Sequence, residues 1–114
     1  MSDEIAVSSD APGAVVETQW WCTAVGDLLV WARLEVHESG LAEVLDASGE
    51  YLRYDDLTAA RMALLDAEFR AFDGLDEEDA AAMGFDLESV EPPKVTGGDE
   101  DLVPLMTLKL LRLQ

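Results

Sequence analysis

The chain has 114 residues, which is enough for one hydrophobic core and too few for two of ordinary size. Hydrophobic residues make up 49% of it, but each apolar run falls well short of the ~20 residues that cross a bilayer, so we expect no membrane span. Twenty-five acidic against seven basic residues give a net charge of −18, which disfavours direct binding to nucleic acid or to anionic lipid surfaces.

The amino-terminal part of the sequence predicts a tail followed by a β-hairpin. Residues 1–17 show neither a helical nor an alternating period, so we expect a disordered acidic tail. Residues 18–25 are mostly β-branched, aromatic or small, and Gly26-Asp27 interrupts them before a second apolar stretch begins. A two-residue loop with glycine first predicts a type II′ turn, in which Gly26 takes a positive φ.

The second strand, residues 28–37, alternates clearly between two faces. We assign one set to the core: Leu28, Val30, Ala32, Leu34 and Val36. The other set consists of Leu29, Trp31, Arg33, Glu35 and His37. Folding the hairpin about its turn places Trp21 opposite Ala32 on the core face. Trp20 then lies opposite Arg33 on the other face.

Two further strands and a long helix complete the predicted fold. Residues 41–45 and 51–54 read as strands between turn clusters, which gives a four-stranded antiparallel β-meander. An α-helix over residues 57–72, with an acidic N-cap before it and Gly74 after its end, would pack on one face. The predicted class is therefore α+β.

A short second helix follows this long helix. Asp76 is its N-cap, Leu75 is placed for a hydrophobic staple with Ala80, and Gly84 ends it. We expect Phe85 to fold back onto the core. The predicted α+β domain spans residues 18–91.

The remaining residues, 92–114, are predicted to form a flexible linker and a C-terminal segment. Pro92-Pro93 stops any continuing helix, and residues 96–101 read as a flexible loop. Residues 102–114 favour a strand, because Thr107 and Lys109 alternate with apolar neighbours. Such a strand would add to an edge of the meander or pair with another molecule.

Several kinds of chemistry are excluded by what the sequence lacks. A single cysteine, Cys22, and a single histidine, His37, can form neither an internal disulfide nor a Cys/His zinc site. The two lie in predicted strands without a nucleophile motif, so we expect no catalytic residue. The glycine pair 97–98 precedes acids and cannot cradle phosphate, so we expect no cofactor. No apolar stretch follows the acidic N-terminus, which argues against secretion and favours the cytoplasm.

The acidic run of residues 73–79 invites a calcium interpretation. Its spacing does not match an EF-hand loop, which needs oxygen ligands at fixed positions, a central glycine and a final glutamate. Helix capping by acidic residues accounts for the same run without a ligand, so we predict no metal site.

Glu68 is the candidate half-buried carboxylate. On the predicted helix it falls with Arg61 inside the apolar arc, although the two are too far apart to pair. The favoured interpretation is structural, with a partner for Glu68 at the sheet edge. The alternative is a carboxylate of raised pKa at the mouth of a cleft between helix and sheet.

The preferred candidate interaction face is formed by Trp20, Trp31 and Arg33. Two exposed indoles beside a guanidinium would form the kind of apolar patch that marks a partner site. The competing interpretation is that the C-terminal segment or the region of Phe85 covers these side chains.

The charge is concentrated in residues 55–91, which hold twelve acids against two arginines, a net charge of −10. This field would steer a basic partner, but it is also compatible with a plain solubility device or adaptation to salt. The leading functional prediction is a small non-catalytic cytoplasmic protein that acts by protein–protein interaction, and its oligomeric state is left open. The alternatives are a DNA-mimic inhibitor of a basic nucleic-acid-binding protein, and a small enzyme or ligand carrier that uses Glu68.

Overall fold

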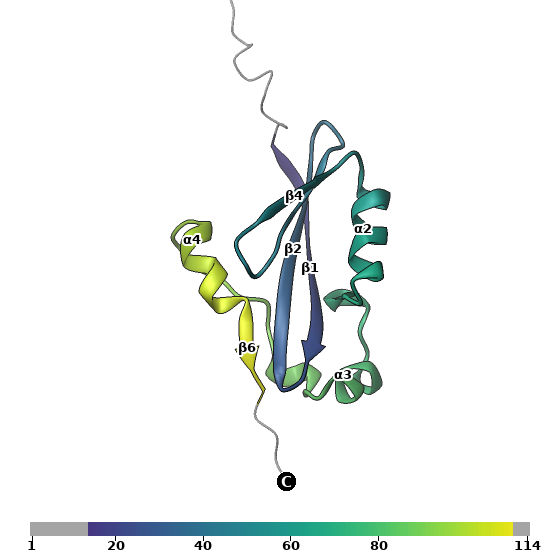
Figure 1. Cartoon of the computed structure of the whole chain (residues 1–114), viewed down its shortest axis with the longest axis vertical. Coiled ribbons are helices and arrows are strands. Elements are labelled where there is room, and N and C mark those ends of the chain that lie inside the picture. Colours follow the sequence, from purple (N-terminus) through teal and green to yellow (C-terminus); the bar gives the residue numbers. More distant parts are fainter. Residues whose placement is uncertain (1–13, 111–114) are drawn as a thin grey trace, which may run out of the picture.

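The computed structural model describes residues 14–110 and confirms the α+β class (Figure 1). The central sheet has the strand order β4-β3-β2-β1-β5, in which β5 is Arg70–Ala71, and β6, Thr107–Lys109, also pairs with β2. The first four strands form the antiparallel meander that the sequence predicts. Their bounds are β1 Val15–Val25, β2 Leu28–His37, β3 Ala42–Leu45 and β4 Tyr51–Tyr54.

The β1–β2 hairpin has the predicted register. Trp21 pairs with Ala32 and Trp20 pairs with Arg33. Gly26 has φ +62°. Asp27 has a negative φ, because Glu68 is the one non-glycine residue of positive φ in the described chain. This combination is that of the predicted type II′ turn. The tail prediction is wrong for residues 15–17, which belong to β1, whereas residues 1–13 lie outside the described residues.

Helix α2, Leu57–Asp66, begins where the sequence predicts and ends earlier. The Asp56 carboxylate caps it by accepting from the Ala59 N–H at 2.8 Å. The predicted continuation to residue 72 is wrong, because a two-residue strand β5, Arg70–Ala71, pairs there with β1 instead. Gly74 consequently lies in the short 3₁₀ turn η2, Phe72–Gly74, and not at the end of α2.

The early end of α2 is a Schellman motif. The Phe69 N–H donates to the Leu64 carbonyl and the Glu68 N–H donates to the Leu65 carbonyl, both at 2.9 Å. Glu68 occupies the left-handed position with φ 72°, where glycine is the usual residue. Phe69 packs in the same cluster as Leu64, which gives the motif its hydrophobic contact.

Helix α3, Glu77–Met83, is the predicted second helix. Asp76 and Asp79 form a capping box, and Gly84 ends the helix with φ 97°. Leu75, Ala80 and Phe85 are buried around it, as expected from the sequence. The turn η3, Leu87–Ser89, follows.

The C-terminal segment is more ordered than predicted. The expected loop at residues 96–101 contains the start of α4, Asp99–Leu102, which continues into η4, Val103–Leu105. Three acids in its first turn favour the helix because they lie at the positive end of its dipole. The strand predicted within residues 102–114 is confirmed for β6, Thr107–Lys109, which pairs with residues 28–30 of β2, and is wrong for residues 102–105, which are helical. Residues 111–114 lie outside the described residues.

Both faces of the sheet are covered, by different parts of the chain. Figure 1 shows α2 along one side of the strands and α4 with β6 on the opposite side. The buried cluster of the α2 face comprises Trp21, Ala32, Leu34, Ala42, Val44, Ala60 and Leu64. The buried cluster of the other face, here called the C-terminal face, comprises Cys22, Leu29, Trp31, Leu45, Leu75, Ala80, Phe85, Val90, Leu102, Met106 and Leu110.

Candidate functional site: a groove between the sheet and the C-terminal segment

The two tryptophans of the predicted interaction face lie inside the C-terminal face. Trp31 is 1% exposed and Trp20 is half-buried, and their rings meet edge to face with centroids 5.9 Å apart. Phe72 contacts Trp31 as well, with centroids 5.1 Å apart. The prediction of an exposed aromatic patch is wrong, because Phe85 and Met106 belong to the layer that covers it.

Arg33, the third member of that predicted face, anchors the C-terminal segment to the sheet. Its two terminal nitrogens donate to the two carboxylate oxygens of Asp99, at 2.9 and 3.1 Å. Its Nε lies 3.4 Å from a carboxylate oxygen of Glu35, and its side chain is 14% exposed. A bidentate contact of this kind fixes geometry as well as charge, so α4 is held in register with β2.

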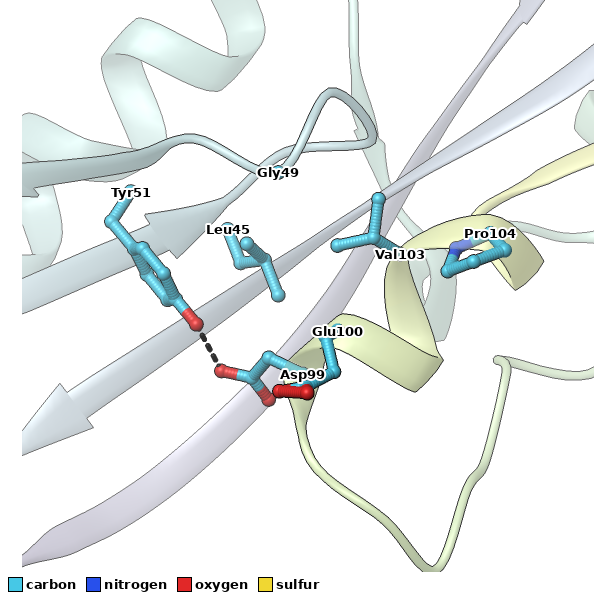
Figure 2. Close-up of a pocket in the computed structure, with 7 residues that line it drawn as sticks. All are labelled: Leu45, Gly49, Tyr51, Asp99, Glu100, Val103 and Pro104. Atoms are coloured by element: carbon cyan, nitrogen blue, oxygen red, sulfur yellow. Dashed lines mark hydrogen bonds between the residues drawn. The ribbon is translucent and has the colours of Figure 1, made fainter.

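Tyr51 of β4 completes this cluster. Its hydroxyl donates to Asp99, as the dashed line in Figure 2 shows. The hydrogen bond to Asp99 is the main reason that the pKa of Tyr51 rises to about 12. Hydrogen bonds from Arg33 and then Tyr51 lower the pKa of Asp99. Burial lowers the pKa of Arg33, but the hydrogen bond to Asp99 and the neighbouring negative charges outweigh it and leave that pKa raised.

An open groove of about 560 Å³ lies beside this cluster, between β4 and the α4–η4 segment. Figure 2 shows Tyr51 on one side and Pro104 on the other, with Leu45 between them. Leu45 is fully buried beneath the groove, and the accessible apolar wall is formed by Val103, which is half-buried, and Pro104, which is exposed. The lining residues are Leu45, Gly49, Tyr51, Asp99, Glu100, Val103 and Pro104.

The turn between β3 and β4 shapes the upper wall of the groove. The Asp46 carboxylate accepts from the backbone N–H groups of Ser48 at 2.9 Å and Glu50 at 3.0 Å, which holds the turn together. Gly49 has φ 90°, and a Cβ atom there would lie 3.9 Å from Val103. The turn and the η4 segment therefore face each other across the groove.

Glu100 gives the groove its negative charge. It is exposed at the groove, and no ion pair among residues 14–110 involves it. Asp99, by contrast, is already paired with Arg33. The groove therefore combines an apolar wall at Val103 and Pro104 with an acidic side chain that remains available to a ligand.

The remaining candidate, Glu68, does not line a cleft. It is exposed just beyond the end of α2, because the helix ends at Asp66. The prediction places Glu68 within a helix that continues to residue 72. Arg61 is exposed too, with its guanidinium 5.8 Å from the centre of the Trp21 ring. The half-buried carboxylate predicted at Glu68 is wrong.

Cys22 is buried in the C-terminal face and is not placed as a nucleophile. Burial raises the pKa of its thiol to about 12, so almost no thiolate forms at neutral pH. Cys22 pairs with Trp31 in the hairpin, whereas His37 lies at the opposite end of β2 beside Val15. The structure therefore does not bring these two residues together.

The groove could not be predicted from the sequence, because its walls are far apart in the chain. Tyr51 and Asp99 are 48 residues apart, and Arg33 and Asp99 are 66 residues apart. One local feature predicts part of the groove: the acids of residues 99–101 follow a glycine pair and favour the start of a helix. That signal predicts an element and not the strand that it contacts.

No protein-family model matches the chain, and no curated protein or solved structure matches it. Within residues 14–110 no helix has both the length and the apolar character needed to cross a membrane.

Proposed function

We propose that this chain is a non-catalytic cytoplasmic protein that binds a basic protein partner, with a lysine or arginine of the partner seated in the groove between β4 and α4. The observation that carries the proposal is the combination of an accessible apolar wall at Val103 and Pro104 with an exposed carboxylate at Glu100 in one groove. A long cationic side chain matches this arrangement, because its methylene stem packs on apolar surface while its charged end reaches a carboxylate.

The charge of the whole chain supports the same partner class. A net charge of −18 accelerates encounter with a basic surface and disfavours acidic partners. The groove is about 560 Å³, a size suited to one or two side chains and not to a folded domain. The rest of the contact would lie on the surrounding acidic surface.

A pull-down from the native cell extract tests the proposal. The baits are the wild type, the groove variant Glu100→Lys, and the control Glu77→Lys, which makes the same change of charge at an exposed position of α3. We expect a basic protein to be retained by the wild type and by Glu77→Lys at low salt, to be lost from Glu100→Lys, and to be released at high salt. Equal loss from the two variants, or no salt dependence, would contradict a specific acidic groove.

Duplex DNA in the same experiment tests the DNA-mimic version of this function. The net charge of −10 over residues 55–91 is what permits this version. If the partner is a nucleic-acid-binding protein, duplex DNA should displace it from the wild type, and neutral polymers should not. Retention in the presence of excess DNA would rule out the DNA-mimic version and leave the groove proposal standing.

A further inference from the structure

Strand pairing brings three metal-ligating side chains together beside Arg33. Glu35 and His37 are two residues apart on β2 and so share a face, and Glu43 of β3 pairs directly with Glu35. One donor atom from each of the three side chains lies within 4.8 Å of the other two. These residues lie on β2 and β3 outside the groove of the proposed function.

All three side chains are largely shielded from water. His37 is 6% exposed, and the side chains of Glu35 and Glu43 are 20% and 15% exposed. Two carboxylates placed directly opposite each other on neighbouring strands repel, and the repulsion grows as water is excluded. A cation between them would remove this cost.

Each of the two carboxylates is also paired with an arginine through one of its oxygens. Arg33 lies 3.4 Å from Oε2 of Glu35, and Arg53 lies 3.0 Å from Oε2 of Glu43. A carboxylate has a second oxygen that can bind a cation while the first accepts from an arginine. The two arginines therefore orient the carboxylates in the way that second-shell groups orient metal ligands.

We propose that Glu35, His37 and Glu43 bind one divalent transition-metal ion of the zinc type. One imidazole nitrogen with two carboxylate oxygens is a ligand set that suits Zn²⁺ and its first-row neighbours, whereas Mg²⁺ and Ca²⁺ prefer oxygen alone. Ligands of one zinc ion lie ~3.5 Å apart, so small side-chain rotations would bring these three to the metal. The sequence predicted no metal site because one cysteine and one histidine cannot form a Cys/His zinc site and a calcium loop needs ligands at fixed spacings in one segment, whereas here two strands supply the ligands.

Calorimetric titration of the chelator-treated full chain with ZnCl₂ tests the site. The wild type should bind one equivalent of Zn²⁺, and Glu35→Gln and Glu43→Gln should each weaken that binding by at least about tenfold. The control Glu77→Gln removes an exposed acid of α3 and should leave the affinity unchanged. Co²⁺ should give a visible absorption band in the wild type that is lost in His37→Gln, with circular dichroism checking that the variant folds.

Two results would overturn the proposal. Equal affinity in the wild type, Glu35→Gln and Glu43→Gln would show diffuse binding to the acidic surface. Absence of a stoichiometric Zn²⁺ event in the wild type would exclude the site outright. If His37→Gln does not fold, Glu35→Gln and Glu43→Gln still decide between the two outcomes, because each keeps the shape of the glutamate side chain. None of these results depends on the groove, so they leave the proposed function unaffected.

Discussion

At the scale of single residues, Asp99 joins the sheet to the C-terminal segment. Its carboxylate accepts from Arg33 of β2 and from Tyr51 of β4. These hydrogen bonds lower the pKa of Asp99, so its contribution to stability is present above the pKa of the unfolded chain and is lost as the pH falls. The cluster should therefore weaken in acid.

Tyr51 reports on the same contact at high pH. Its pKa is raised from 10.0 to about 12, so its contribution to stability is present below pH 10 and is lost as the pH rises through about 12. The chain has two tyrosines, and a Tyr54→Phe background leaves Tyr51 as the one that titrates. In that background we expect Asp99→Asn to lower the pKa of Tyr51 towards 10, as followed by tyrosinate absorbance. An unchanged titration would show that Asp99 does not hold the hydroxyl.

Trp31 carries a structural role instead of the binding role that the sequence suggested. Because it is 1% exposed, Trp31→Ala should lower the free energy of unfolding by about 3–5 kcal/mol in urea denaturation. Met62→Ala is the matched control, since Met62 is 60% exposed on α2 and its loss should change stability little. A small effect of Trp31→Ala would mean that the C-terminal face is not closed over this ring.

At the scale of elements, the end of α2 shows where pattern reasoning fails. The residues after 66 are good helix formers, so propensity alone extends the helix to Phe72. The Schellman hydrogen bonds and the pairing of β5 with β1 end it instead. The capping signals at Asp56 and Asp76 are local and were predictable, whereas a stop that depends on a distant strand was not.

Glu68→Gly tests the Schellman motif directly. A residue with a Cβ atom is strained at φ 72°, and glycine removes this strain. The strain energy removed should exceed the entropic cost of a more flexible unfolded chain by roughly 0.5–1 kcal/mol, so the free energy of unfolding should rise. Glu68→Ala is the control, because it removes the carboxylate and keeps the Cβ atom. If Glu68→Ala stabilises the protein equally, charge and not backbone strain is the cause.

At the scale of the whole molecule, the sequence predicted one covered face of the sheet and the structure has two. The alternation in β2 correctly separated the residues that face α2 from those that face away. It did not show that the second set is also buried, because the covering residues 75–110 lie far along the chain. Periodicity records the orientation of side chains and not what lies opposite them.

The candidate sites, too, could be predicted only in part from the sequence. Arg33, Glu35 and His37 were assigned to one face from the alternation of β2 alone. Their partners Glu43, Tyr51 and Asp99 come from three other elements, so the groove and the ligand cluster required the full topology. Because the tryptophans are covered, the proposed binding surface is the groove beside α4 and not the centre of the sheet.

Amide chemical-shift mapping with a tri-arginine peptide at low salt tests the groove most directly. We predict that the shifts concentrate on Gly49, Tyr51, Glu100 and Val103 and largely disappear in Glu100→Gln. Shifts at the indole N–H groups of Trp20 and Trp31, or spread evenly over the acids of residues 55–91, would contradict the account.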